Sequence, residues 1–415
     1  MSSDIKKVRV LFNDSHVNLP SSTLVPQGGP SRFAQTFASF TINNPQENIE
    51  LISLLFSASY KGKSDFYVRH HQSEGHTFYE LMYAKEGLTK TYTQNFTKAE
   101  FVKYLEPWIQ GVKKVIRQSN PDIVFLNNID LRGYIMMRAA SEMNIPVTIQ
   151  HAGIWKKENF LSHKIYSDSI RKIFNSFDKE IIKKTKKQIF LNGMSRDEFF
   201  NLHNTPLTDE LKKKITIIPL PIEDVPLKDF KETFGKVLRV GVVARWDRIK
   251  NHSAVFRLAV YAQRHNLPIK IISVTKPPAG VRSHFLQRYK TMIQIVEPMS
   301  PKLLRNFYHN CDIILMPSRF DVSPTVVAEA LSQGVPVITS SQTGWVGHFK
   351  KYKLDDCIIG PYDSGKKIAD TIFQVSRNFK KYRPRFNLFR DHISQWHSEH
   401  IVFKQYYKLF RELSK

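Results

Sequence analysis

Three loops in the chain each lie between an apolar strand-like run and a helical run, and each carries residue types that could bind an anion. The first is Gln27-Gly28-Gly29-Pro30-Ser31-Arg32. Glycine lets a ligand approach the backbone closely, and the free N–H groups at a helix start attract anions or sugar hydroxyls. Gly29 is therefore a candidate ligand contact, although a tight turn without a ligand explains the same residues.

The second loop is Ala244–Asn251, which contains Arg245 and Lys250 and runs into a helix. A guanidinium fork and an ammonium point charge beside a helix start make a suitable clamp for a diphosphate. In a chain this basic, a solvated loop with no ligand is the competing interpretation.

The third loop combines two carboxylates with a helix start. Asp321 lies in the loop and Glu329 lies 329 − 321 = 8 residues later, about one turn into the predicted helix. Between them, Ser323, Pro324, Thr325 and Val326 occupy the helix start, where backbone N–H groups lack partners. One acid could face a reacting centre while the other holds ligand hydroxyls; a loop cap and an ordinary helix acid are the alternative.

The elements that position these loops follow the pattern of an α/β protein. Short β-branched runs alternate with helical stretches in two successive series, which predicts two doubly wound domains with parallel sheets. The predicted strands are 8–13, 49–55, 122–126, 146–150, 188–191, 238–243, 269–274, 293–296, 312–316, 335–339 and 357–359, and the predicted helices are 30–39, 101–119, 131–143, 251–265, 301–310 and 326–333. We expect domains at 1–225 and 236–388, with a closing helix or helices at 389–415 that pack back on the first domain. Residues 60–97 are polar and aromatic and predict only loops and short strands.

Composition narrows the function classes. The 415 residues hold 62 Lys and Arg against 37 Asp and Glu, a net charge of +25 that predicts a polyanionic partner or substrate. Two cysteines cannot form a disulfide framework or a structural zinc site. The chain has no run of about 18 apolar residues, the length that spans a membrane. It opens without the pattern of a secretory signal, so a cytoplasmic protein is expected.

The stretch CDIILMPSRFDVSPTVVAEALSQGVPVITS resembles the signature of retaining GT-B-fold glycosyltransferases of family four. That signature separates a loop acid from a helix Glu by seven residues and continues into a Gly-x-Pro-Val-Ile strand. VGVVARWDRIKNHSAVFRLA and QGGPSRFAQTFA resemble the same family's donor-phosphate segment and its N-terminal glycine loop.

The resemblance implies a GT-B fold, in which two Rossmann-like domains face a central cleft, and a nucleotide-sugar donor bound mainly by the second domain. Arg245 and Lys250 would neutralise the diphosphate, with the amides near Ser323–Val326 cradling the same phosphates. The resemblance also implies that Glu329 binds the ribose hydroxyls and that Asp321 lies near the donor sugar.

His151, which follows the predicted strand 146–150, matches a family histidine that faces the donor sugar. Transfer would proceed with retention and without a metal or other cofactor. The chain departs from the family at Asp321, where Glu is usual, and at Ala244, where Gly is usual.

Two basic segments bear on partners. Residues 179–187 continue an amphipathic pattern, which predicts either a helix at a membrane surface or a solvated helix face. Residues 377–385 mix cations with aromatics; a charged linker is expected there, with a nucleic-acid or polyphosphate contact as the alternative.

The sequence therefore predicts a hexosyltransferase-type enzyme that moves a sugar from a nucleotide donor to a glycan, lipid-linked or polyphosphate-like acceptor. The location would be the cytoplasm or the inner membrane face. A non-catalytic polyanion-binding protein and a GT-B nucleotide-sugar epimerase remain as alternatives, and no motif for specific nucleic-acid recognition is present.

Overall fold

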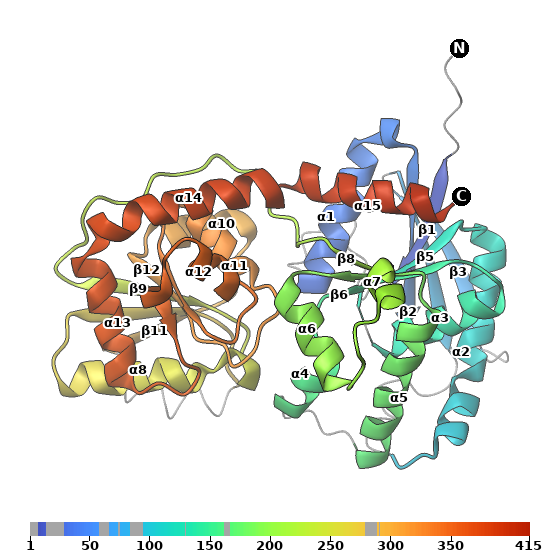
Figure 1. Ribbon diagram of the computed structural model, residues 1–415, viewed down its shortest axis with the longest axis horizontal. Coiled ribbons are helices and arrows are strands. Elements are labelled where there is room, and N and C mark those ends of the chain that lie inside the picture. Colours follow the sequence, from blue (N-terminus) through green and yellow to red (C-terminus); the bar gives the residue numbers. More distant parts are fainter. Residues whose placement is uncertain are drawn as a thin grey trace. The chain divides into compact units, whose positions relative to one another are not determined.

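The computed structural model describes residues 7–13, 29–57, 66–73, 75–83, 94–128, 130–161, 167–278, 289 and 291–415. These residues form two compact units (Figure 1). The first is built mainly from residues up to Pro219 with Val402–Lys415 added, and the second mainly from Leu220–Ile401.

The first unit contains an eight-stranded sheet in the order β3-β4-β2-β1-β5-β6-β7-β8. All neighbouring strands run parallel except β3 and β4, which form an antiparallel hairpin at one edge. The strands are β1 Val8–Asn13, β2 Ile49–Ser57, β3 Phe66–Ser73, β4 His76–Tyr83, β5 Ile123–Leu126, β6 Val147–His151, β7 Lys187–Phe190 and β8 Ile215–Ile217.

The helices of the first unit connect these strands. They are α1 Gly29–Asn43, η1 Pro45–Glu47, α2 Lys98–Ser119, α3 Leu131–Glu142, α4 Trp155–Leu161, α5 Asp168–Lys184, α6 Gly193–Leu202 and α7 Asp209–Lys214. The longer ones, such as α2 and α5, bury an apolar face. The long helix α2 begins at a capping box in which Thr97 accepts from the N–H of Glu100 and the Glu100 carboxylate accepts from the N–H of Thr97.

The last helix of the chain, α15 (Glu399–Leu413), completes the core of the first unit, and Figure 1 shows it beside α1. Phe403 stacks on Phe37 with ring centroids 4.7 Å apart and lies 5.0 Å from the ring of Phe40. The Tyr407 and Thr41 hydroxyls form a 2.8 Å hydrogen bond. Aromatic burial of this kind is what binds Val402–Lys415 to the first unit.

The second unit contains a six-stranded parallel sheet in the order β11-β10-β9-β12-β13-β14. In chain order within the unit this is 3-2-1-4-5-6, the arrangement of a dinucleotide-binding Rossmann fold. The strands are β9 Leu238–Val243, β10 Ile269–Val274, β11 Ile293–Val296, β12 Ile313–Met316, β13 Val337–Ser340 and β14 Ile358–Ile359. The strand order reverses between β9 and β12, which pair directly.

The helices of the second unit are η3 Arg248–Lys250, α8 His252–Arg264, α10 Pro301–His309, α11 Thr325–Ser332, α12 Val346–Lys351, η4 Asp355–Cys357, α13 Gly365–Arg377 and α14 Phe379–His397. Gly334, which ends α11 and leads to β13, has φ +68°, and a Cβ there would lie 2.2 Å from the backbone oxygen of Asp229. Only glycine fits that close approach and that left-handed conformation.

The unit boundaries differ from the expected ones at the C-terminal side. Residues 389–401 stay in the second unit instead of joining the first, and only Val402–Lys415 does so. Phe389 explains the difference, because its fully buried ring stacks on Tyr352 and packs on Trp345.

The basic segments also differ from expectation. Residues 377–385 are not a linker. Arg377 is the last residue of α13, and residues 379–385 form the first turns of α14. In α5 the apolar residues Ile170, Ile173, Phe174 and Phe177 are buried in the unit, so that face is not available to a membrane.

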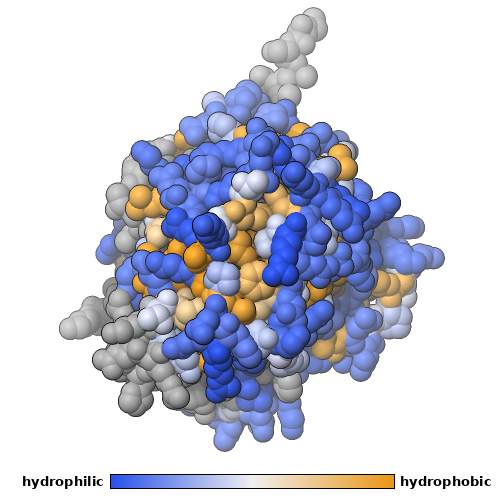
Figure 2. Space-filling model, turned by 90° about the vertical axis from the view of Figure 1, so that its left-hand side faces the viewer, coloured by the Kyte–Doolittle hydropathy of each residue, from blue (hydrophilic) through white to orange (hydrophobic). Residues whose placement is uncertain are grey.

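Hydrophilic side chains cover most of the face shown in Figure 2, with apolar residues gathered near its middle. Among the helices that the structure describes, none combines the length and the apolar character needed to cross a bilayer.

Candidate functional site

The reversal of strand order in the second sheet brings two of the predicted loops together. One follows β9 and contains Arg245 and Lys250, and the other follows β12 and contains Asp321. Ligands of open parallel sheets bind at such a reversal, outside the carboxyl ends of the strands. The second unit therefore places residues 71 positions apart in the chain at one location.

Direct contacts join the two loops. The ammonium group of Lys250 forms an ion pair with the Asp321 carboxylate, and both side chains are mostly buried, with 19% and 13% exposed. The backbone N–H of Arg319 donates to the carbonyl of Ile249 at 2.7 Å. The Asn251 amide donates to the carbonyl of Pro317 at 2.8 Å. The loops form one structural element, and its cation and carboxylate neutralise each other.

The loop after β9 owes its shape to short-range contacts. The Asp247 carboxylate accepts from the N–H of Ile249 at 3.0 Å, which caps η3, and Asn251 takes the left-handed conformation with φ 57°. The ring of Trp246 stacks on that of His252 at 4.4 Å, so Trp246 has a packing role. Arg245 is exposed, and its backbone carbonyl bonds to His252 at 2.8 Å.

Helix α11 begins without a side-chain cap. Pro324 occupies the N-cap position and accepts no bond through its side chain, so the first N–H groups of Thr325 and Val326 are left for other partners. The indole N–H of Trp345 donates to the carbonyl of Pro324 at 2.9 Å and fixes where the helix starts. An uncapped helix start beside a basic loop attracts an anion.

The second predicted acid, Glu329, is held by a buried tyrosine. The Tyr308 hydroxyl donates to Oε2 of Glu329 at 2.8 Å. Glu329 lies four residues after Thr325 and three after Val326, so it shares their face of α11. It is half-buried, as are Ser323, Thr325 and Val326.

The backbone of Asp321 joins this loop to a further segment. Its N–H donates to Gln342 at 3.1 Å and its carbonyl accepts from Gly344 at 2.9 Å. The segment after β13, which includes Trp345, therefore supports both the loop acid and the start of α11.

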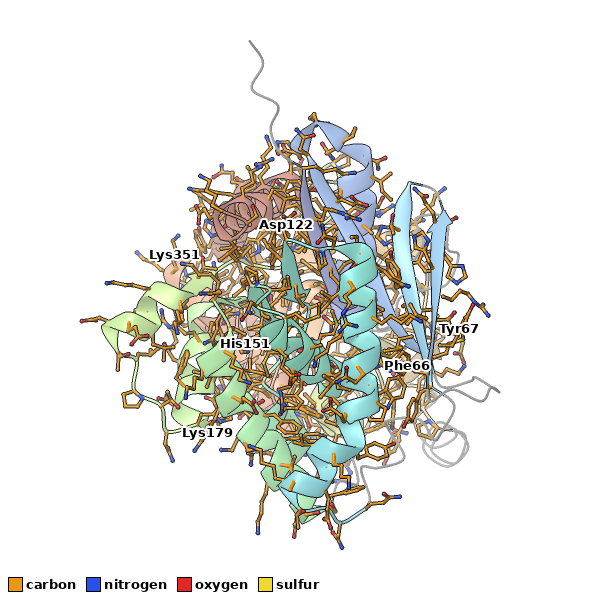
Figure 3. All side chains as sticks on the ribbon, turned by 90° about the vertical axis from the view of Figure 1, so that its right-hand side faces the viewer. Phe66, Tyr67, Asp122, His151, Lys179 and Lys351 are labelled. Carbon is orange, nitrogen blue, oxygen red and sulfur yellow. The ribbon has the colours of Figure 1, made fainter. Side chains whose placement is uncertain are left out.

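The predicted site residues of the first unit are placed differently. His151 is the last residue of β6, and its side chain has no exposed surface; Figure 3 labels it among the helices and strands. Its ring stacks on Phe190 at 4.3 Å and its Nε2 bonds to Gln188 at 3.2 Å. Burial lowers the pKa of His151 to about 3, so the ring is neutral near pH 7. A contact with a donor would need the ring to leave this stack, and its role stays a prediction.

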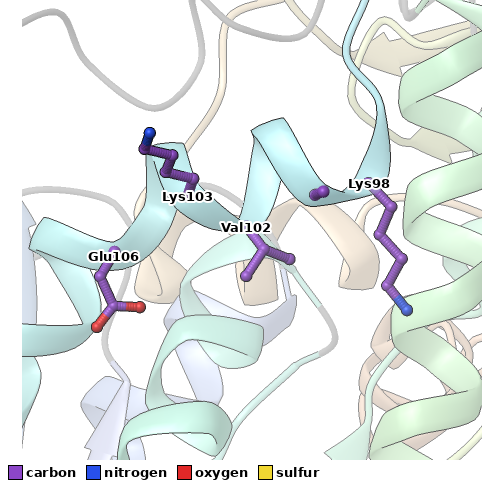
Figure 4. Close-up of a pocket in the computed structure, with 5 residues that line it drawn as sticks. Lys98, Val102, Lys103 and Glu106 are labelled. Carbon is purple, nitrogen blue, oxygen red and sulfur yellow. The ribbon is translucent and has the colours of Figure 1, made fainter.

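Gly29 is the first residue of α1, and the residues before it, with the rest of the Gly-Gly loop, lie outside those the structure describes. Its predicted ligand contact is therefore untested. Figure 4 shows a different hollow in the first unit, lined by Lys98, Ala99, Val102, Lys103 and Glu106, all from α2. That hollow contains none of the predicted site residues.

Three residues of the second unit contribute to the site without having been predicted. Asn251 and Trp345 fix the loops through hydrogen bonds, and Tyr308 orients Glu329. Tyr308 lies 21 residues before Glu329, and Trp345 lies 21 residues after Pro324. No fixed spacing in the sequence signals such contacts, although Trp345 follows β13 at the same sheet edge as the other loops.

A family model matches the part of the chain that contains the loops after β9 and β12. Residues 228–386 match the family model of glycosyl transferases group 1. A stretch of 108 residues is 27% identical to EpsF of Bacillus subtilis (strain 168), whose assignment as a glycosyltransferase is itself a prediction. That stretch covers 25% of this chain and 27% of EpsF, so the match spans about a quarter of the relative's length.

Solved structures share the fold over nearly the whole chain. Sucrose-phosphate synthase from Thermosynechococcus elongatus superposes with a TM-score of 0.71 and 13% identity, covering 98% of this chain and 99% of that one. HepE from Anabaena, solved in complex with UDP-glucose, superposes with a TM-score of 0.62 and 12% identity, covering 97% of this chain and 99% of that one. The chain therefore has the GT-B fold, and its residues 228–386 match the family of group 1 glycosyl transferases.

Proposed function

We propose that the protein transfers a sugar from a nucleotide-diphosphate donor to an acceptor, with the donor bound by the second unit. The observation that carries this proposal is the basic loop after β9, ion-paired to the loop after β12, beside the uncapped start of α11. This combination places the exposed guanidinium of Arg245 and free N–H groups at the strand-order reversal, where a diphosphate needs them.

In the proposed complex, Arg245 and Lys250 neutralise the diphosphate, and the backbone N–H groups of Ser323, Thr325 and Val326 donate to the same phosphates. Neutralising the leaving nucleotide lowers the energy of the transition state, in which that charge develops. Lys250 already pairs with Asp321, so an arriving phosphate competes with the Asp321 carboxylate for the ammonium group. Arg245 is exposed and meets no such competition in the described contacts.

The two acids take different roles. Glu329, oriented by Tyr308, accepts hydrogen bonds from the ribose hydroxyls. Asp321 lies near the donor sugar, and binding of the diphosphate frees its carboxylate from Lys250. We propose retention of the anomeric configuration, in line with the family resemblance. The phosphates' charge is then offset by Arg245, Lys250 and the start of α11 without a divalent ion, so added Mg²⁺ should leave turnover unchanged.

The acceptor is proposed to be anionic. The net charge of +25 favours a phosphorylated or lipid-linked acceptor by long-range attraction. The lysines of α5 contribute exposed charge, for example Lys179 (Figure 3), while the apolar face of that helix is buried. Association with an anionic membrane surface in the cytoplasm would therefore be electrostatic and would weaken with salt.

Ligand-dependent thermal unfolding with UDP-, GDP- and ADP-sugars tests the donor site. A site-specific ligand at 100 times its Kd should stabilise the protein by about 2.7 kcal/mol. Arg245→Ala and Lys250→Met should each weaken binding by about ten-fold, because each removes a charge-assisted contact. Arg264→Ala is the matched control, since it removes an exposed cation at the far end of α8 and should leave binding unchanged.

The variant Asp321→Asn separates binding from transfer. It removes the competitor for Lys250, so free nucleoside diphosphate should bind several-fold more tightly while sugar transfer falls. Tight binding of polyphosphate with no response to any nucleotide sugar would favour the non-catalytic alternative. Conversion of the donor sugar in the absence of an acceptor would instead favour an epimerase.

A further inference from the structure

Three histidines of the second unit that are not among the residues proposed to bind the donor converge. His348 lies on α12, and His392 and His397 lie on α14. One ring nitrogen from each falls within 4.8 Å of the other two. His397 is buried, while His348 and His392 are half-buried, so the cluster is open to solvent on one side.

His397 has the environment of a metal ligand. One of its ring nitrogens hydrogen-bonds to the backbone of Leu220. The other, Nδ1, is buried and has no hydrogen-bond partner in the structure. Metal-bound histidines usually have this arrangement, in which a backbone carbonyl fixes the ring while the second nitrogen faces the ion. Leaving Nδ1 buried without a partner is otherwise unfavourable.

The protonation state of the cluster also suits a cation. Burial lowers the pKa of His348 to about 4 and that of His397 to about 3, and the pKa of His392 is lowered too. Neutral imidazoles carry the lone pairs that bind metals, so these rings need not lose a proton near pH 7.

Two features oppose binding and set its strength. The ammonium group of Lys351 lies near His348 and His392 and repels a cation. The nitrogen separations of up to 4.8 Å must also contract, because zinc bonds of about 2.0–2.1 Å in a tetrahedron place ligand nitrogens about 3.3 Å apart. Side-chain rotation of His348 and His392, which are only half-buried, can supply that contraction.

We propose that His348, His392 and His397 form a zinc site that fastens α12 to α14. Three imidazoles are a known donor set for Zn²⁺, with water in the fourth position. No residue of this site takes part in the proposed transfer reaction. The site does adjoin Trp345, whose ring lies 5.0 Å from that of His397 and 5.3 Å from that of His348. Because Trp345 also bonds to Pro324, bound zinc would stiffen the support of α11.

The test is zinc titration of the full chain after removal of metals by a chelator, with a chromophoric zinc indicator as competitor. We expect one Zn²⁺ per chain, and substitution by Co²⁺ should give the visible absorption of a four-coordinate site. Zinc should also raise the unfolding temperature. His348→Gln and His392→Gln should each weaken zinc binding at least ten-fold and abolish the zinc-dependent rise, even if the variants unfold at a different temperature without metal.

Two control variants sharpen the result. His309→Gln removes an exposed histidine on α10 and should leave zinc binding unchanged. Lys351→Gln removes the repelling charge and should tighten binding several-fold. Zinc affinity that is equal in the wild type, His348→Gln and His392→Gln would overturn the proposal, as would binding of several ions with no change on Lys351→Gln. Neither outcome would affect the proposed donor site, which nucleotide binding tests separately.

Discussion

The same contact joins the first and fourth parallel strands in both units. In the first unit the Asp122 carboxylate accepts from the N–H of Arg9 at 2.8 Å, and the N–H of Asp122 donates to the carbonyl of Arg9. In the second unit Asp312 and Arg239 repeat both bonds, again with 2.8 Å to the carboxylate. In each unit the aspartate immediately precedes the fourth parallel strand, so the same aspartate–backbone contact occurs in both sheets.

The units differ at the opposite ends of these strands. Among the described residues at that end of the first sheet, neutral polar groups bond to one another: Asn13 accepts from the N–H of Asn127 at 2.6 Å, and Tyr406 donates to Gln150. In the second unit the corresponding loops carry Arg245, Lys250 and Asp321. The described residues therefore include neutral hydrogen-bonded pairs at this edge of the first sheet and a charged edge with Arg245, Lys250 and Asp321 in the second, which is why we assign the diphosphate to the second unit.

The largest expected effect concerns a second difference between the units. The first unit needs a segment distant in the sequence, Val402–Lys415, to complete its core. Phe403→Ala removes a ring that is fully buried against Phe37 and Phe40. The loss should be about 3–5 kcal/mol, the usual cost of such a cavity. Thermal unfolding should show the first unit melting earlier while nucleotide binding by the second persists. Equal destabilisation of both units would contradict the contrast.

The shared aspartates allow a direct comparison of the two sheets. Asp122→Ala and Asp312→Ala each leave a strand N–H without its acceptor, at a cost of about 1–3 kcal/mol. Asp312→Ala should be the more severe, because Asp312 also pairs with Lys231 at 2.8 Å. Chemical denaturation of both variants measures this, with Lys231→Met as control. A larger loss for Asp122→Ala would show that the ion pair contributes little.

Acid should destabilise both units, each of which has a buried histidine. Burial lowers the pKa of His151 and of His397 to about 3, below the ordinary value of 6.5. The unfolded chain therefore binds more protons between about pH 6.5 and 3, and stability falls as the pH falls through that window. The slope is at most about 1.4 kcal/mol per pH unit for each histidine. His151→Phe should flatten the pH profile of the first unit alone; an unchanged profile would mean that the pKa of His151 is the same in the folded and unfolded chain.

The smallest expected effect concerns the support of the charged edge. Trp345→Phe removes the indole N–H that donates to Pro324 while it keeps an aromatic ring in place. It should cost about 0.5–1.5 kcal/mol in stability, with a donor Kd a few-fold weaker and no change in the first unit. Calorimetric titration with nucleotide checks this, and tighter binding would show that the contact holds α11 in an unsuitable position.

Much of the fold could be predicted because it depends on local pattern. The strands Val8–Asn13, Leu238–Val243, Ile269–Val274 and Ile293–Val296 have the expected bounds, since β-branched runs between turns specify buried parallel strands. The hairpin of β3 and β4 was not resolved from the sequence, because its aromatic and polar residues lack a clean alternation.

The site was predictable only as separate loops. Residue types pointed to Lys250 and to Asp321, but their ion pair spans 71 positions and appears only in the folded sheet. Burial could not be predicted either, as His151 illustrates: a strand-end histidine can face solvent or the interior, and packing on Phe190 determines which. The same holds for α5, whose amphipathic pattern fits a membrane surface as well as a protein core.

The return of Val402–Lys415 to the first unit has a consequence for how the chain folds during synthesis. Nearly all of the second unit lies in one continuous segment, Leu220–Ile401, which can fold as soon as it has left the ribosome. The first unit cannot, because its aromatic core around Phe37 stays uncovered until α15 has been made, after the whole of Leu220–Ile401. The nascent first unit is thus the part most in need of a chaperone, and the second unit is the first to reach its native state.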